Sequence, residues 1–251
     1  FGTYQDAITK DIKQNFLFHS NISSSLNIGL LDLNELIEKI VAFDAPYNAK
    51  EGFIRQIIGW REFMLRVYED DGVPLRNSNF FEFKNPMPKK IIETKSGIKI
   101  LDDTISKLQL TAYNHHIERL MILGNIFLLL EIKPNDVYEF FMKYYIDAYD
   151  WVMVGNVYGM SGFSDGGSIT TKPYIASSNY LLKMSDYSKN ESWCEIVDGL
   201  YWRFLYKYSH KFDKNPRMKM QIALLNKMPK EKLENLLKIA NDFLENLFIA
   251  N

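Results

Sequence analysis

Hydrophobic residues recur along most of the chain at the spacing of an α-helix. Between residues 31 and 44 they form one stripe, made of Leu33, Leu36, Ile37, Ile40 and Val41. The next segment begins near Pro46 and stops at Gly72, and its apolar positions are spaced by four, three and four: Phe53, Ile57, Trp60 and Met64. This periodicity is that of an amphipathic helix with one face toward a core. We therefore predict a helix over each segment.

Further helices are indicated by their start signals. Asp102 can cap a helix that runs to about Ile122, and Pro134 stands where the first turn of a helix tolerates proline. The last 60 or so residues have the pattern of two or three helices, the last from about Lys230 to Leu247.

Two segments interrupt this pattern. Gly72 to Lys99 contains three prolines, and we predict a long irregular crossing there. Val154 to Tyr174 contains five glycines and one proline, and we predict a loop of a length that is often functional. Neither a strand–helix alternation nor an internal repeat is visible. The sequence predicts an all-α fold of about ten to twelve helices in a single domain over residues 1–251.

The amino-acid composition excludes few classes of protein. The chain has 251 residues, 47% of them hydrophobic, and it is rich in aromatic residues, which suits either a well-packed core or a flat bound cofactor. The net charge of −1 does not demand a nucleic-acid partner. One stretch, Arg203 to Lys219, is basic and is either a solvated helix face or a patch that contacts phosphates.

The cysteine count and the hydropathy favour a cytoplasmic protein. Cys194 is the single cysteine, so the chain can form neither an internal disulfide nor a cysteine-based metal site. The longest apolar run, Ile126 to Leu130, is far shorter than the roughly 20 residues of a membrane helix. Charged residues interrupt the start of the chain where a secretory signal would be apolar. We expect no membrane association and no bound metal.

Two motifs have a possible role in binding an anion. The segment from Phe18 to Asn27 is rich in serine and precedes a helix, where free backbone N–H groups either bind an anion or are capped in the ordinary way. Arg61 follows Trp60 within an amphipathic helix. A buried guanidinium needs an acidic partner, so Arg61 either pairs with a carboxylate or phosphate or lies at the surface.

Two adjacent histidines interrupt a predicted buried helix. Continuing the apolar stripe from Ile105 and Leu108 points His116 inward and leaves His115 on the rim, about 100° away. Together with Arg119 they form either a polar pocket wall or a satisfied polar site in the core. Adjacent helical residues point in different directions, which argues against zinc. Further along, Asp147 and Asp150 either cap a helix or accept hydrogen bonds from a ligand N–H.

Eight ordered motifs extend over nearly the whole chain and resemble the cryptochrome/photolyase family. They occupy residues 1–7, 17–31, 51–63, 115–125, 145–152, 156–161, 171–187 and 200–204. The closest resemblance is to the FAD-binding C-terminal half of the iron–sulfur bacterial cryptochromes and prokaryotic (6-4) photolyases. It implies an all-α domain that holds FAD in a bent form. The N-terminal α/β antenna half of the family has no counterpart in the sequence.

The resemblance assigns roles to individual residues. It places four residues around the FAD pyrophosphate: His19, Ser20, Ile22 and Ser23. It implies further cofactor contacts by Gln56, Arg61, His116, Arg119, Asp147, Tyr149 and Met153. Arg119 and Asp147 would lie beside the isoalloxazine ring, where Asp147 accepts from a flavin N–H. On the lesion side it implies catalytic roles for His115, His116 and Tyr174.

The activity that the resemblance implies is light-driven repair of DNA. A reduced, excited flavin would donate an electron to a UV-damaged pyrimidine pair after that pair is flipped out of the duplex, and the (6-4) product is the expected lesion. A nearby histidine would donate a proton, because its ordinary pKa is close to neutral. The resemblance also admits a blue-light sensor or a non-enzymatic flavin-binding module. Damaged DNA, in the nucleoid, and a separate antenna chain are the expected partners.

The sequence departs from this family pattern in three features: the cluster cysteines, the electron-relay aromatics and the residue near flavin N5. Ile100 and Ser188 stand where cluster cysteines are expected, and Cys194 alone cannot hold an iron–sulfur cluster, so we predict that the cluster is absent. Aliphatic or phenyl side chains replace the electron-relay aromatics at Ile92, Phe140 and Phe141. Met153 replaces the acidic residue expected near flavin N5, and a thioether cannot exchange a proton there. These changes predict slow or rerouted photoreduction.

Overall fold

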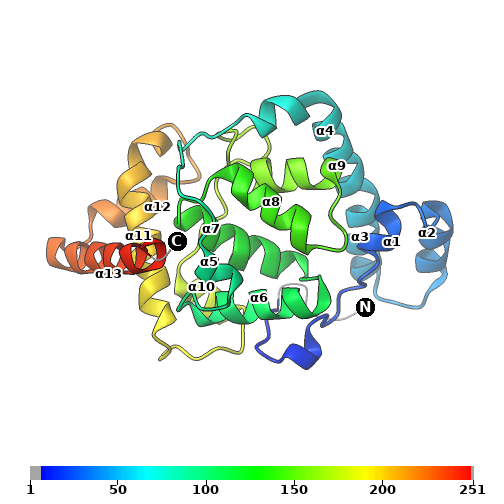
Figure 1. The fold of residues 1–251 in the computed structure, drawn as a ribbon. Helices are drawn as coiled ribbons and strands as arrows, with labels where there is room; N and C mark the ends of the chain where they lie inside the picture. Colours follow the sequence, from blue (N-terminus) through cyan, green and yellow to red (C-terminus); the bar gives the residue numbers. More distant parts are fainter. Residues whose placement is uncertain (1–6, 250–251) are drawn as a thin grey trace.

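The structure is a computed structural model that describes residues 7–249, and it is built from helices (Figure 1). In chain order they are η1 (Ile12–Gln14), α1 (Ser23–Asn27), α2 (Leu33–Ala42), α3 (Tyr47–Arg55), η2 (Gln56–Trp60), α4 (Arg61–Arg76), α5 (Lys89–Ile92), α6 (Lys99–Thr111), η3 (Glu118–Gly124), α7 (Asn125–Leu129), α8 (Pro134–Tyr144), α9 (Asp150–Met153), η4 (Val154–Ser161), α10 (Ser178–Lys183), α11 (Trp193–Tyr208), η5 (Ser209–Phe212), α12 (Lys219–Asn226) and α13 (Lys230–Phe248).

The all-α prediction and the predicted number of helices are confirmed for the described residues. Several neighbouring elements run on without a break, because η2, η3 and η4 are π-helical segments within longer helices. Residues 7–249 form no strand, only isolated bridges that join Ile8 to Ser185 and Asn85 to Ile132. None of these helices is both long enough and apolar enough to span a bilayer. Residues 1–6, which carry most of the first family motif, lie outside the described part.

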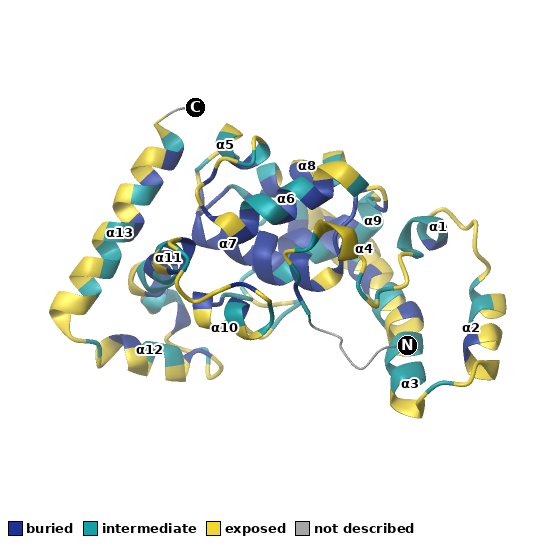
Figure 2. Ribbon diagram, turned by 90° about the horizontal axis from the view of Figure 1, so that it is seen from below, coloured by how far each residue is buried: buried dark blue, intermediate teal, exposed yellow. Residues whose placement is uncertain are grey.

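The core is centred on α7, all of whose side chains are buried. Around it pack the inner faces of α6, η3, α8, η4 and α11, and Figure 2 shows this centre as a continuous buried region. Figures 1 and 2 place α1–α3 at one end of the molecule and α12 and α13 at the other. Burial of apolar area at about 25 cal/mol per Å² is the main stabilising contribution to such a core.

The close approach of α11 and α13 depends on Gly199. A Cβ atom at this position would lie 2.9 Å from the carbonyl oxygen of Leu236 and 3.3 Å from the amide nitrogen of Ala240. Both atoms belong to the backbone of α13 and cannot move aside as a flexible side chain would. Any larger residue must therefore push the two helices apart.

We expect Gly199→Val to lower the free energy of unfolding by about 2 kcal/mol, since overpacking of a tight contact costs about 1–3 kcal/mol. Urea denaturation measures this change. The matched control is Gly59→Val, because the nearest atom to a Cβ at Gly59 is 3.9 Å away. Equal losses in the two variants would show that the cost comes from valine in a helix and not from the α11–α13 contact.

The helix that begins after Pro46 does not stop at Gly72, as predicted, but continues to Arg76. Gly72 is buried, and a Cβ there would only reach ordinary contact with the ring of Tyr68, at 3.4 Å. Pro74 is accommodated because it stands in the last turn, where one missing N–H disturbs little of the helix. The predicted irregular crossing therefore begins later, and it contains the short helix α5.

The predicted helix from Asp102 to Ile122 is also wrong, because the chain breaks in its middle. Helix α6 starts at Lys99, and its C-cap Ala112 has a left-handed backbone with φ of 52°. The Asp102 carboxylate accepts from the backbone N–H groups of Ser96 and Gly97, in the turn before the helix. The chain then turns before η3 begins, so the two adjacent histidines do not continue the apolar stripe of α6.

The first part of the predicted glycine-rich loop is a helix. Residues Val154–Ser161 form η4, which packs against α4. A Cβ at Gly155 would lie 2.6 Å from the Met64 sulfur, and one at Gly159 would lie 2.1 Å from the Ile169 Cδ1 atom. These glycines therefore allow η4 to pack closely against its neighbours, and they do not mark a flexible loop. The loop itself is limited to the residues between η4 and α10.

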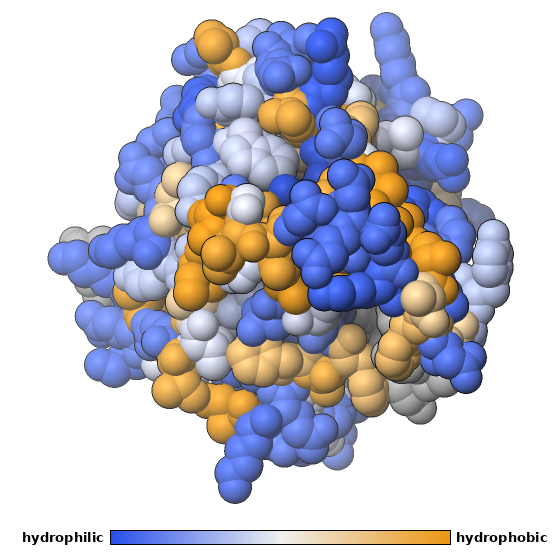
Figure 3. All heavy atoms as spheres, turned by 90° about the vertical axis from the view of Figure 1, so that its right-hand side faces the viewer, coloured by the Kyte–Doolittle hydropathy of each residue, from blue (hydrophilic) through white to orange (hydrophobic). Residues whose placement is uncertain are grey.

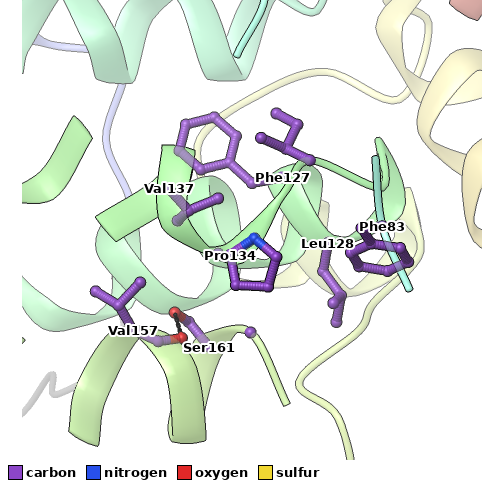
Figure 4. A pocket seen from close by; sticks show the side chains of 10 residues that line it. Phe83, Phe127, Leu128, Pro134, Val137, Val157 and Ser161 are labelled. Carbon is purple, nitrogen blue, oxygen red and sulfur yellow. Dashed lines mark hydrogen bonds between the residues drawn. The ribbon is translucent and has the colours of Figure 1, made fainter. Parts of the chain in front are cut away.

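The α1–α3 end exposes apolar side chains, which Figure 3 shows gathered among hydrophilic residues on this face. They are Ile28, Leu30, Leu31, Val41, Phe43 and Tyr47, and Ile58 of η2 and Phe63 of α4 are exposed as well. An open groove of about 580 Å³ lies beside Val41, Tyr47 and Ile54. In the core, by contrast, the cavity in Figure 4 is about 10 Å³ and is lined mainly by apolar residues, among them Phe127 and Val137. It has room for about one water molecule, so it is not a cofactor site.

Candidate functional site

The centre of the candidate site is an ion pair between Arg119 and Asp147. Both guanidinium NH groups donate to the carboxylate, at 2.9 and 3.0 Å, in the bidentate arrangement that arginine favours. The Arg119 guanidinium also lies over the rings of Tyr145 and Tyr113, at 4.2 and 5.1 Å. Burial works against the charge, but the Asp147 carboxylate outweighs it and raises the pKa of Arg119. Two hydrogen bonds therefore fix the guanidinium against the carboxylate.

Two residues of α1 donate hydrogen bonds to Asp147, and one of them also binds Arg61. The Ser23 hydroxyl donates to the carboxylate at 2.6 Å, and the Asn27 amide donates to the Asp147 carbonyl at 2.8 Å. Asn27 in turn accepts a hydrogen bond from Arg61 at 2.5 Å. Because Ser23 and Asn27 are four residues apart in α1, both face the same way along the helix. A continuous polar path therefore joins Arg61 to Arg119.

Arg61 is a half-buried cation without an acidic partner. Its guanidinium donates to neutral acceptors, the Asn27 side chain and the Leu26 carbonyl, and it lies 5.1 Å from the centre of the Trp151 ring. No carboxylate lies within 4 Å of it among residues 7–249, and burial lowers its pKa. Glu62 opposes that effect only through charge. A desolvated guanidinium with neutral partners fits an anionic ligand group such as a pyrophosphate.

Three imidazoles lie together beside this path. The rings of His19 and His115 are stacked, with centroids 4.4 Å apart and an angle of 8° between their planes. The rings of His116 and His19 are nearly perpendicular, with centroids 5.2 Å apart. The prediction that His116 points inward and His115 lies on the rim is wrong. His115 is 0% exposed and His116 is exposed, because the left-handed break at Ala112 changes the direction of the chain.

The surroundings of His115 favour the neutral ring. Burial lowers the pKa of His115 to about 2, and the other two histidines and the positive charges of Lys107 and Arg119 act in the same direction. Neither ring nitrogen has a hydrogen-bond partner in the described part of the chain. Leaving a buried polar group unpaired costs about 1–3 kcal/mol. Two unpaired nitrogens in so buried a ring leave it open to a hydrogen-bond partner beyond residues 7–249, such as a ligand.

Beneath the histidines lies a second, deeper ion pair. The Lys107 ammonium donates to Glu118 at 2.7 Å, and the two side chains are 2% and 0% exposed. Lys107 also donates to the carbonyl of Thr9, which fastens the N-terminal segment to α6. Asn114 donates to the other Glu118 oxygen at 3.1 Å. Burial raises the pKa of Glu118, and Lys107 opposes that rise.

Comparison with known proteins identifies the family. The chain is 39% identical to a (6-4) photolyase of Agrobacterium fabrum over 261 aligned positions, which cover 98% of this chain and 51% of that protein. The chain belongs to the photolyase/cryptochrome family. The resemblance to this family that the eight motifs predicted is thereby confirmed, whereas the iron–sulfur branch stays a prediction. The chain spans about half the length of this relative.

Two viral proteins are also similar to this photolyase-family chain. Both are uncharacterised proteins of Acanthamoeba polyphaga mimivirus. One is 44% identical over 128 residues, which is 51% of this chain and all of that protein. The other is 33% identical over 109 residues, which is 41% of this chain and 81% of that protein. No protein-family model matches the chain.

The remaining predicted site residues of this photolyase-family chain lie outside the contacts described above. Ser20, Gln56 and Tyr149 are exposed, whereas Ile22 and Tyr174 are half-buried. Tyr174 packs against the main core. Met153 is buried in that core with 3% exposure, so a flavin N5 partner there would be apolar. The assigned roles of these residues stay predictions.

The altered family positions are compatible with a packed protein interior. Ile100 is fully buried in the main core, as are the predicted relay positions Phe140 and Phe141. The Cys194 sulfur lies 4.0 Å from the carbonyl of Ser188, and burial raises the pKa of this thiol, which favours the neutral form. The absence of an iron–sulfur cluster stays a prediction, which iron and sulfide analysis of anaerobically purified protein tests.

Sequence reasoning missed the residues that connect the predicted ones. Asn27 links Arg61 to Asp147, and Asn114 links Glu118 to the Tyr145 hydroxyl, which donates to it at 2.8 Å. The four-residue spacing of Ser23 and Asn27 was a usable signal. Lys107 had none, because its contact with Glu118 arises only from the break between α6 and η3.

Proposed function

We propose that this chain binds FAD at the Arg61–Asp147–Arg119 path and acts as a photolyase-like protein on UV-damaged DNA. The observation that carries the proposal is the joining of residues distant in sequence into one polar site. Contacts run from Arg61 through Asn27 and Asp147 to Arg119, whose backbone N–H donates to the carbonyl of His115. Such convergence of charged groups beside an unpartnered imidazole is typical of ligand sites.

Each charged residue would have a distinct task toward FAD. Arg61, which lacks a carboxylate partner, would hold the pyrophosphate. Asp147 has 4% exposure and its orientation is fixed by Arg119, so it would accept a hydrogen bond from a ring N–H of the flavin. Ser23 donates to Asp147 and would exchange that bond for one to the ligand. When bound, FAD would supply light-driven electron donation to the substrate.

His116 and His115 would have different roles toward the substrate. His116 is exposed and would donate a proton to a damaged base that enters from solvent. His115 is neutral and buried, so it would serve as a hydrogen-bonding wall of the pocket rather than as the acid. The substrate would be a (6-4) product in DNA, flipped out of the duplex at low cost because damage weakens its stacking.

A light sensor or non-enzymatic flavin module is the second candidate. It is favoured by Met153, Phe140 and Phe141, which cannot carry protons or electrons as the expected residues would. The two candidates separate by substrate: a sensor would bind FAD and respond to blue light but would not repair a (6-4)-containing oligonucleotide.

We expect Arg61→Met to weaken FAD binding about 10- to 100-fold, since hydrogen bonds to charged groups contribute about 1.5–3 kcal/mol. Fluorescence titration of the reconstituted chain measures the affinity. The control is Arg66→Met, five residues further along α4, because Arg66 is exposed and pairs with Asp70 at 2.7 Å. Equal FAD affinities of the Arg61→Met and Arg66→Met variants would contradict the assignment of Arg61 to the pyrophosphate.

A further inference from the structure

His115 requires a hydrogen-bond acceptor that the described structure places just out of reach. Every imidazole carries at least one N–H, yet both nitrogens of this fully buried ring are unpartnered among residues 7–249. Glu118 Oε2 lies 3.7 Å from Nε2. A shift of roughly 0.8 Å would bring the two atoms to ordinary hydrogen-bond distance. The carboxylate is the natural acceptor for an N–H at Nε2.

Glu118 is held so that it cannot turn away from the ring. Lys107 donates to Oε1 at 2.7 Å, and Asn114 donates to Oε2 at 3.1 Å. Asn114 is itself held by the Tyr145 hydroxyl and by the carbonyl of Thr104. Because Oε1 of Glu118 accepts from the Lys107 ammonium, Oε2 is the oxygen that can accept a hydrogen bond from His115.

The surrounding charges exclude a protonated ring. The charged and titratable groups that face His115 are Lys107 and Arg119, the carboxylates Glu118 and Asp147, and the imidazoles of His19 and His116. Each cation is already paired with one carboxylate, at 2.7 and 2.9 Å. An imidazolium would add an uncompensated charge in the interior, which is costly.

We propose that Glu118 is a positioning residue, which fixes His115 as the neutral tautomer with its proton on Nε2 and leaves Nδ1 as a buried hydrogen-bond acceptor. This inference rests on the proposed function only for the identity of the ligand at Nδ1. The group that Nδ1 would meet is an N–H or O–H donor of the bound flavin or of the flipped-out base. Selecting the tautomer in advance would align that acceptor before the ligand arrives.

Nitrogen-15 NMR of the whole chain, labelled at histidine and kept in the dark without flavin, tests the proposal. The protonated and bare nitrogens of an imidazole differ widely in chemical shift, and loss of a signal in His115→Gln identifies the ring. We expect His115 to be neutral with its proton on Nε2, unchanged between about pH 5 and about pH 8, where ordinary histidines titrate. A charged ring at neutral pH, or a proton on Nδ1, would overturn the proposal.

The His115 spectrum of the Glu118→Gln variant tests the proposal more directly than the wild-type spectrum does. The amide oxygen would keep the Lys107 ammonium. The NH₂ group would replace Oε2, lose the bond that Oε2 accepts from Asn114, and donate to Nε2 of His115. The tautomer of His115 should therefore invert, with the proton moving to Nδ1. The control, Glu35→Gln, breaks the exposed pair with Lys39 and should leave the His115 spectrum unchanged.

An unchanged tautomer in folded Glu118→Gln would refute the inference, and if this variant does not fold, the wild-type spectrum alone decides. These spectra need neither light nor flavin. A chain without repair activity would therefore refute the proposed function while leaving the tautomer result intact, so the two failures are distinguishable.

Discussion

Replacing Lys107 by methionine should destabilise the protein by about 3–5 kcal/mol, which is the usual cost of removing one partner of a buried ion pair. Glu118 is 0% exposed and would keep its charge in the interior with Asn114 as its remaining donor. The N-terminal segment would also lose its bond from Lys107 to the Thr9 carbonyl. Urea denaturation monitored by circular dichroism measures the change in the free energy of unfolding.

Two controls separate this buried charge from a general effect of losing a lysine. Lys39→Met removes a cation from an exposed pair with Glu35 and should leave stability unchanged within error, because solvent screens that pair. Lys107→Met combined with Glu118→Met should lose less than Lys107→Met alone, since neither charge is then left unpaired. Equal stabilities of the two single variants would contradict the importance of the pair.

The destabilisation should depend on pH in a defined direction. Burial raises the pKa of Glu118 above its ordinary value of 4.5 in the folded chain, and loss of Lys107 removes the main opposing effect. A carboxylate whose pKa is higher in the folded state destabilises that state where the group is ionised, and the penalty disappears where the group is protonated in both states. The penalty should therefore be complete above the folded pKa and shrink as the pH falls toward 4.5.

Asp147→Asn should weaken FAD binding by about 100-fold or more, since truncating one member of a buried, hydrogen-bonded charge pair costs about 2–5 kcal/mol in a binding site. The amide has one acceptor oxygen where the carboxylate has two, and Arg119 and Ser23 already compete for them. The ring N–H of the flavin would then lack its acceptor. Fluorescence titration with FAD measures the loss.

Asp150→Asn is the matched control for this prediction. Asp150 stands three residues further on and accepts hydrogen bonds from Tyr68, Arg76 and Tyr138, so its loss also removes a carboxylate with several donors. It takes no part in the path from Arg61 to Arg119. Equal losses of FAD affinity in both variants would show that general stability, and not the Asp147 contact, controls binding.

The sequence predicted the helical fold because apolar periodicity is a local property. Prediction from the sequence failed where tertiary packing gives a residue a role that its type does not usually indicate. Glycine usually marks a loop, but Gly155 and Gly159 let η4 approach α4 and Ile169. The left-handed conformation of Ala112 is rare for a residue with a Cβ atom, so no pattern indicated the break. That single backbone angle exchanged the predicted positions of His115 and His116.

The candidate site was partly predictable for a different reason. His19, Arg61, Arg119 and Asp147 were assigned by resemblance, and the structure joins them through contacts that no periodicity contains. The supporting residues were not predictable, because Lys107 and Glu118 are brought together only by the turn between α6 and η3. Resemblance indicated the residues expected at the ligand, whereas the structure was needed to show what holds them.

Light-dependent repair by the FAD-loaded chain tests the central claim most directly. Wild-type protein and the Asp147→Asn variant would be supplied with FAD that has been reduced chemically, which bypasses the altered relay residues. Each would then be mixed with a (6-4)-containing duplex and illuminated with blue light. We predict restored pyrimidines in the light, none in the dark, and a large loss with Asp147→Asn. Flavin-loaded wild-type protein that yields no repaired DNA in the light would contradict the proposed function.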